Sequence, residues 1–232
     1  MTVTSASELK LIAGGSLAGL FGEIGPLFEK SSGHTLAIHF DSTPNIIGRI
    51  NSGTPFDTVV VPIDVFKDSA AKERLTDPIE VARVGYGVII RAGLAKPDLS
   101  TPEAFKKSLL AASSVASVPA SAAGAYVTKV YERLGIADEM KAKTKVEALP
   151  TAIAPAVAKG EAELGVFLTN VFNAPGIELA GPFPADLQQE LAFAAAIAKD
   201  VKATDAANAL LDFMKTPPAV AAIKAAGMTP VL

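Results

Sequence analysis

The sequence predicts an α/β protein built on mostly parallel sheets. Short apolar runs of strand length alternate with longer amphipathic stretches of helical spacing along all 232 residues. Fifty per cent of the residues are hydrophobic and 19% are charged, which is the composition of a globular chain. No internal repeat or low-complexity tract interrupts the alternation. A chain of this length buries roughly 70% of its unfolded surface, so its core needs no disulfide or metal ion.

The first third of the chain predicts three strand–helix units. Gly14-Gly15 ends the first strand, and Ser16 follows as an expected helix N-cap. Gly33 ends the first helix, and we expect His34 beside it to be a solvated loop residue. The expected strands are 9–13, 35–40 and 56–62, and the expected helices are 17–28, 45–52 and 65–75. Such an order is typical of a parallel sheet with right-handed crossovers.

The remaining two thirds continue the pattern with shorter elements. Two glycines within 84–91 suit a strand that bends or changes its partner. The expected strands are 84–91, 114–118, 146–149, 164–167 and 191–198, and the expected helices are 102–110, 126–134, 152–159, 205–214 and 218–226. Residues 177–180 precede a turn-rich stretch at 181–184. Alternation over the whole length predicts the doubly wound α/β class.

The composition excludes several classes of site. The chain has no cysteine and only two histidines, which removes zinc–thiolate centres, iron–sulfur clusters and thiol nucleophiles, so we expect no metal and no cofactor. A net charge of −3 without a basic run argues against a nucleic-acid partner. No segment reaches the roughly 18 apolar residues that span a bilayer, so we expect no membrane insertion.

The first residues, 1–8, are polar and lack the basic region of a signal peptide. We therefore expect a periplasmic location if the chain is a mature form without its signal peptide. If Met1 is the native start, we expect a cytoplasmic location.

Hydroxyl-bearing loops follow three of the expected strands. These loops are Gly14-Gly15-Ser16, Asp41-Ser42-Thr43 and the stretch Val118–Gly124 that contains Ser121. In parallel sheets, ligands gather at the carboxyl ends of strands, where helix N-termini direct their N–H groups. Each serine or threonine taken alone is better explained as a helix cap. Three such loops at equivalent points favour an anion site, and the absence of a glycine-rich phosphate loop argues against a nucleotide.

The same segments resemble the periplasmic molybdate-binding proteins. Ala13-Gly-Gly-Ser-Leu17, Phe40-Asp-Ser-Thr43 and Ile50-Asn-Ser-Gly-Thr-Pro-Phe-Asp57 are similar to the family's Ala-Ala-Ala-Ser-Leu, Phe-Ala-Ser-Ser and Ile-x-x-Gly-x-Pro-Ala-Asp. The resemblance extends to Gly160–Gly165 and Phe213–Pro217. It implies a two-lobed type 2 periplasmic-binding-protein fold, with lobe 1 at 1–84 plus 199–232, lobe 2 at 85–198 and two crossing strands at the hinge.

The resemblance also implies a set of ligand-binding residues. Ser16 and Thr43 match the family's two oxyanion-binding serines, with Gly15 and Ser42 beside them. Ala120, Ser121 and Thr151 match segments that supply backbone donors. The family's tyrosine falls on Leu168, and Asp41 stands where a small residue is expected. A carboxylate there repels a doubly charged oxyanion, so molybdate itself is not the expected ligand.

Arginine is the usual partner of a carboxylate ligand. Arg91 ends the expected crossing strand, and we weigh a ligand clamp against a solvated surface residue; for Arg49 we favour the surface. Arg91-Ala-Gly93 followed by Pro97–Phe105 resembles the non-molybdate branch that includes aconitate isomerase. Such an isomerase needs a group that moves a proton between carbons, and the candidates are His39, Tyr126 and Asp41. His39 and Tyr126 are more simply explained as structural residues.

The favoured interpretation is a binding protein whose two lobes close around a small anion, an organic acid rather than molybdate. The alternative is an isomerase of an unsaturated polycarboxylate that uses the same cleft. We expect a monomer, and an exported form would deliver its ligand to the membrane component of an ABC transporter.

Overall fold

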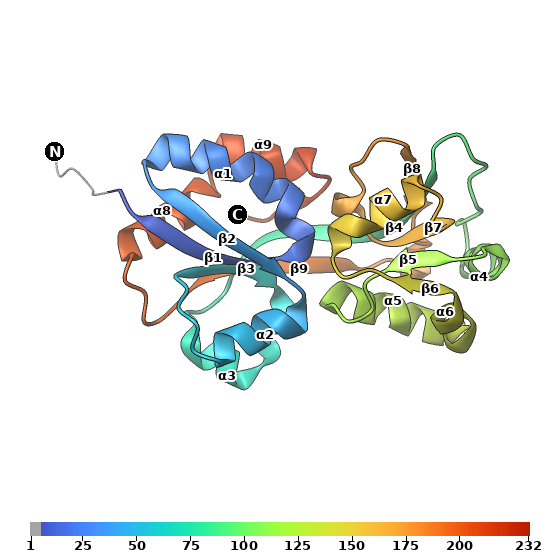
Figure 1. Cartoon of the computed structure of the whole chain (residues 1–232), viewed down its shortest axis with the longest axis horizontal. Coiled ribbons are helices and arrows are strands. Elements are labelled where there is room, and N and C mark those ends of the chain that lie inside the picture. The colour runs from blue at the N-terminus through green and yellow to red at the C-terminus, as the bar shows by residue number, and fades with distance from the viewer. Residues whose placement is uncertain (1–5) are drawn as a thin grey trace. The chain divides into compact units, whose positions relative to one another are not determined.

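The computed structural model describes residues 6–232 and divides the chain into two compact units. Unit 1 contains the chain up to Arg83 together with Ala192–Leu232, and unit 2 contains Val84–Leu191. Two strands, β4 (Ile79–Arg91) and β9 (Glu190–Ile197), have residues in both units. The predicted α/β class is confirmed, and each unit has its own sheet with helices on both faces (Figure 1).

The sheet of unit 1 is parallel at its centre. β1 (Glu8–Gly14) pairs in parallel with β2 (Thr35–Asp41) on one side and with β3 (Thr58–Pro62) on the other. β9 runs antiparallel to β3, and the short β10 (Thr229–Pro230) pairs with the first part of β4. Every residue of β3 is buried, which explains its apolar run Val59–Val61.

Helices cover both faces of this sheet (Figure 1). On one face, Phe28 of α1 packs edge-on against Phe213 of α8, and Phe21 of α1 contacts Phe40 of β2. The other face is covered by α2 and α3, whose apolar residues form a core cluster with β3. The bounds of these helices are α1 Ala18–Ser32, α2 Thr43–Asn51, α3 Ser69–Arg74, α8 Thr204–Phe213 and α9 Pro217–Ala225.

The sheet of unit 2 is mixed. β5 (Val115–Ser117) pairs in parallel with β6 (Thr144–Val146) and with β7 (Leu164–Leu168). β4 runs antiparallel to β7 and also to β8 (Ile177–Pro182). Helices α5 and α6 cover one face and α7 covers the other (Figure 1). The helices of this unit are α4 Pro102–Ala111, α5 Ala122–Arg133, α6 Ala137–Lys143 and α7 Ile153–Ala158.

Three local expectations differ from the structure. The strand expected at 146–149 is β6 at 144–146, and residues 137–143 before it form α6, which the sequence analysis did not assign. Ser16 lies inside a 3₁₀ turn, Gly15–Leu17, so α1 begins after it. The expectation of a solvated His34 is wrong: it is 5% exposed, stacks on Phe28 and accepts a hydrogen bond from the Ser7 amide at Nδ1.

Candidate functional site

Two hydroxyl-bearing loops meet at the carboxyl edge of the unit 1 sheet. The parallel register of β1 and β2 places Gly14 opposite Asp41, so the residues that follow each strand leave the sheet side by side. Ser16 lies in the turn after β1, and Thr43 is the first residue of α2 after β2. Both side chains are buried, with 8% and 9% of the residue exposed. The structure therefore brings together the two hydroxyls that the sequence analysis selected.

The turn after β1 is held close to the sheet by small residues. A Cβ atom on Gly14 would lie 3.2 Å from Cδ of Pro62 and 3.3 Å from Cε1 of Phe193, so the backbone fits here only with little side-chain volume. Gly15 and Ser16 continue directly into the 3₁₀ turn. The first amides of such a turn have no acceptor within the turn, and they suit an anion for that reason.

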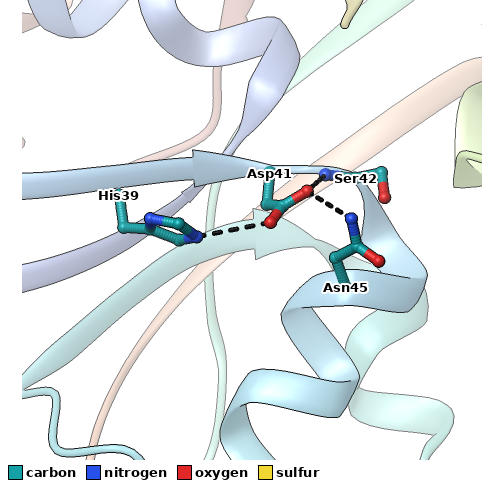
Figure 2. A network of polar contacts seen from close by, with 4 residues as sticks. All are labelled: His39, Asp41, Ser42 and Asn45. Atoms are coloured by element: carbon teal, nitrogen blue, oxygen red, sulfur yellow. Dashed lines mark hydrogen bonds and ion pairs between the residues drawn. The ribbon is translucent and has the colours of Figure 1, made fainter. Parts of the chain in front are cut away.

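Asp41 is the centre of a polar network at the end of β2 (Figure 2). Its Oδ1 accepts hydrogen bonds from the Ser42 amide at 2.8 Å and from the Asn45 side-chain amide at 2.7 Å. Its Oδ2 lies 3.3 Å from Nε2 of His39, two residues earlier on the same face of the strand. The carboxylate thus turns toward α2 and His39, because residues i and i+2 of a strand share a face.

These contacts favour the ionised form of Asp41. Burial opposes ionisation, but the hydrogen bonds from Asn45 and Ser42, together with His39, outweigh it and lower the pKa of the carboxyl. A negative charge therefore stands at the N-terminus of α2, one residue before Ser42. Because Coulomb repulsion scales with charge, a compact dianion is disfavoured there about twice as strongly as a single carboxylate.

His39 also faces an open pocket of about 440 Å³ beside β2, the edge strand of the unit 1 sheet. Lys10 of β1 and Arg49 of α2 line the same pocket, so one imidazole and two basic side chains surround it. The side chain of His39 is 42% exposed, which leaves its ring open to solvent as well as to Asp41.

In unit 2, the carboxyl ends of β5, β6 and β7 also meet at one edge. The parallel register aligns Ser117 with Val146, and the Glu147 amide donates to the Ser117 carbonyl at 2.9 Å. The loop Val118–Ser121 follows β5, and Thr151 lies in the turn Pro150–Ala152 after β6. Ala120 and Thr151 are exposed, whereas Leu168 at the end of β7 is fully buried and offers no polar side-chain group.

Ser121 organises the loop that leads into α5. Its Oγ donates to the Val118 carbonyl at 2.8 Å and accepts from the Gly124 amide at 3.0 Å, which caps the helix. A Cβ atom on Gly124 would lie 1.8 Å from the Val118 carbonyl oxygen, so only glycine lets the first turn of α5 pack on this loop. The hydroxyl of Ser121 is thus committed to the fold, and the backbone is what this segment presents.

Comparison with known proteins decides the family. Residues 9–229 match the family model described as bacterial extracellular solute-binding protein. The chain belongs to this family. Among curated relatives of this solute-binding protein, an aconitate isomerase from Pseudomonas sp. is 29% identical over 97% of this chain and 88% of its own. The molybdate-binding protein ModA of Azotobacter vinelandii is 28% identical over 96% of this chain and 90% of its own.

Solved structures share the fold of this solute-binding protein. A periplasmic molybdate-binding protein from Azotobacter vinelandii superposes with a TM-score of 0.78 at 22% identity, and the match covers 97% of this chain and 99% of that one. The predicted resemblance to the molybdate-binding proteins and their type 2 fold is confirmed. The similarity to an aconitate isomerase was also anticipated from the sequence.

One candidate of the sequence analysis, Arg91, lies elsewhere in this solute-binding protein. β4 is antiparallel to β7, and its register places Ile90 beside Leu164, the amino end of β7. Arg91 therefore lies at the opposite edge of the unit 2 sheet from Ser121 and Thr151. We no longer count it among the residues that could donate to a ligand beside those two. Tyr126 on α5 is half-buried, and its hydroxyl donates to the Leu187 carbonyl at 2.8 Å.

The sequence analysis also missed two residues that shape the candidate site. Asn45 holds Asp41 from the first turn of α2, and its spacing of four residues from Asp41 was the available signal. Gly124 was quoted only as the end of a loop, although a glycine three residues after a capping serine indicates close backbone packing.

Within residues 6–232, no group of three or more acidic or histidine side chains is arranged to hold a metal ion. Over the same residues, no helix combines the length and the apolar character that crossing a bilayer requires.

Proposed function

We propose that this protein binds a small organic acid through carboxylate contacts and does not select molybdate. The observation that carries the proposal is the register of β1 and β2, which brings Ser16 and Thr43 to one buried edge beside the N-terminus of α2. Hydroxyls and amides of this kind hold anions without a full positive charge.

Asp41 supports an organic acid over a compact oxyanion. Its ionised carboxylate, one residue from Ser42, repels a dianion more strongly than a single carboxylate group. Leu168 further replaces the hydroxyl that the resemblance to molybdate-binding proteins leads us to expect. Both differences weaken binding of a tetrahedral dianion and leave a carboxylate acceptable.

A ligand panel tests this function. Citrate, cis- and trans-aconitate and succinate are compared with molybdate, tungstate and sulfate by thermal shift and calorimetry. A ligand at a hundredfold excess over its Kd stabilises the folded protein by about 2.7 kcal/mol, which a melting experiment resolves. We expect a carboxylate to bind and molybdate to be weaker by at least tenfold. Molybdate as the tightest ligand would overturn the proposal.

Two variants test the residues. Ser16→Ala combined with Thr43→Val removes both hydroxyls, and we expect affinity for the best ligand to fall roughly 10- to 100-fold, since a hydrogen bond to a charged group contributes about 1.5–3 kcal/mol. Ser52→Ala is the matched control, because its hydroxyl lies at the far end of α2 and bonds to the Arg49 carbonyl. Equal affinities in both variants would exclude Ser16 and Thr43 from the site.

One observation favours a second candidate, an isomerase of an unsaturated polycarboxylate. His39 and Asp41 form a base–carboxylate pair at 3.3 Å, and Lys10 and Arg49 share the pocket that His39 lines. A histidine oriented by a carboxylate can take a proton from one carbon and return it to another. The relative named aconitate isomerase agrees with this chemistry.

Proton NMR of trans- and cis-aconitate incubated with the protein tests this candidate. Interconversion that disappears in His39→Gln and persists in Ser52→Ala supports the isomerase. Binding of aconitate without any interconversion excludes it and leaves the carrier function standing.

For the carrier function, we propose a monomer that works in the periplasm and passes its ligand to the membrane component of an ABC transporter. Fractionation of cells that express the native reading frame tests the location. A product confined to the cytoplasm would contradict the transport role.

A further inference from the structure

An open pocket of about 220 Å³ lies beside the first turn of α8, at the amino edge of the unit 1 sheet. Ser7, just before β1, and His34, just before β2, line one side of it, and residues 202–206 line the other. Ser16 and Thr43 follow the carboxyl ends of the same two parallel strands, so they lie at the opposite edge of the sheet. The pocket is therefore separate from the hydroxyl loops.

The amides at the start of α8 have no acceptor. Ala203, the residue before the helix, has no side-chain oxygen that could cap it. The first amide of the helix with a partner is that of Ala207, which donates to the Ala203 carbonyl at 2.9 Å. The amides of Thr204, Asp205 and Ala206 make no hydrogen bond with any of residues 6–232. Such amides form the positive end of the helix dipole and suit an anion.

His34 points to a ligand independently of the helix. It is only 5% exposed, yet it lines the pocket. Its Nδ1 accepts a hydrogen bond from the Ser7 amide at 3.2 Å, so the proton of the neutral ring is on Nε2. Nε2 has no partner among residues 6–232, and it is not one of the polar side-chain atoms that the fold seals from solvent. The fold thus leaves one N–H donor of a largely buried ring to a group in the pocket.

The charges around the pocket favour a ligand with a single negative charge. Lys202 and Asp205 line it, both are exposed, and their opposite charges offset each other. The remaining attraction is that of the helix N-terminus, roughly half a positive charge. Attraction of this size rises in proportion to the charge of an ion, whereas the cost of removing the ion from water rises with the square of its charge. The volume lies below the roughly 300–1,000 Å³ of drug-sized sites, so the ligand is small.

We propose that this pocket binds a small monocarboxylate ion, whose two oxygens accept hydrogen bonds from the first amides of α8 and from the Nε2–H group of His34. A carboxylate fits because it offers two acceptor oxygens, which can meet donors on opposite sides of the pocket. Bound in this way, the ion would link α8 to the segments that begin β1 and β2. The proposal does not depend on the ligand of the hydroxyl loops.

An NMR titration of the full chain with sodium acetate tests the site, with sodium chloride exchanged for acetate so that the ionic strength stays constant. We expect saturable shifts of the amide signals of residues 204–206 and of the Nε2 signal of His34. The amides of Gly15 and Ser42 report on the hydroxyl loops in the same spectra, so the two sites are read separately. Sulfate, a dianion, should bind at residues 204–206 more weakly than acetate.

Variants separate a built site from general attraction of anions. His34→Asn keeps an acceptor near the position of Nδ1 but removes the donor at Nε2, and it should weaken acetate binding roughly tenfold. His34→Gln returns an N–H group close to the position of Nε2 and should restore part of the affinity. Lys202→Gln should weaken binding about two- to fivefold, whereas Lys224→Gln, at an exposed position of α9 outside the pocket, should leave it unchanged.

Circular dichroism verifies the fold of each variant, and the two lysine variants decide the outcome where a histidine variant does not fold. Shifts that do not saturate, equal affinity in wild type and His34→Asn, equal effects of Lys202→Gln and Lys224→Gln, or tighter binding of sulfate than of acetate would each overturn the proposal.

Discussion

The side chain of Gln188 forms hydrogen bonds with both the backbone amide and the backbone carbonyl of Tyr86. Its Oε1 accepts from the Tyr86 amide at 2.9 Å, and its Nε2 donates to the Tyr86 carbonyl at 2.8 Å. The side-chain amide thus extends the pairing of β4 beyond the end of β8, where the Phe183 amide also donates to the Tyr86 carbonyl at 3.1 Å. The two residues are 102 positions apart. Tyr86 is 1% exposed, so water does not compete for these bonds.

Gln188→Ala should therefore destabilise the protein by about 2 kcal/mol, roughly the contribution of two hydrogen bonds in a buried setting. The free energy of unfolding from urea titration measures the loss. Gln189→Ala is the matched control: the neighbouring side chain is exposed, and its substitution should change stability by less than about 0.5 kcal/mol. Similar values for the two variants would show that the bonds to Tyr86 add nothing.

Asp41→Asn should cost about 1 kcal/mol at neutral pH, because the neutral amide weakens the contacts to Ser42, Asn45 and His39. The pKa of Asp41 is lower in the folded chain than its ordinary value of 3.8, so ionisation favours folding. This contribution is fully present above the unfolded value and is lost as the pH falls below 3.8 through the folded pKa.

The stability difference between wild type and Asp41→Asn should accordingly shrink as the pH is lowered below 3.8. Urea titrations between neutral pH and the acid range measure it. Asp212→Asn, which removes an exposed ion pair with Lys215, should show a small difference at every pH. A difference at Asp41 that stays constant with pH would contradict the role of its charge.

Gly124→Ala should destabilise unit 2 by about 3 kcal/mol, since the new Cβ would lie 1.8 Å from the Val118 carbonyl oxygen and 2.6 Å from Cα of Pro119. Both contacts are backbone atoms, so relief requires the loop to move. Gly22→Ala on α1 is the control, because a Cβ there meets nothing within 4 Å. That control should be stabilised by about 0.5–1 kcal/mol through helix propensity. Calorimetric melting compares the pair.

Tyr126→Phe should lower stability by about 1 kcal/mol and leave ligand affinity within twofold of wild type. The reason is that the Tyr126 hydroxyl is already bonded to the Leu187 carbonyl, and its ring packs 4.8 Å from that of Tyr86. Denaturant titration and calorimetry with the best ligand of the panel provide the two readouts. If turnover of aconitate were lost while stability stayed unchanged, Tyr126 would instead take part in the chemistry.

The amino-acid sequence by itself determined the α/β class, the order of most strands and helices, and the family resemblance. These features depend on local periodicity, on glycine and proline at element ends, and on short ordered motifs such as Phe40–Thr43, all of which involve residues close together in the sequence. Helix α6 was not predicted because its seven residues contain a single fully buried side chain, Met140, and so carry little amphipathic signal.

The tertiary structure alone decided which residues share an edge of a sheet. Strand pairing places Ser16 with Thr43 and moves Arg91 to the edge opposite Ser121, because the direction of β4 relative to β7 is a long-range property that no local pattern encodes. The burial of His34 likewise arises from packing between distant segments, as does the burial of the Tyr131 hydroxyl, which has no hydrogen-bond partner among residues 6–232. Side-chain chemistry can be listed from sequence, whereas its partners are fixed only when the chain folds.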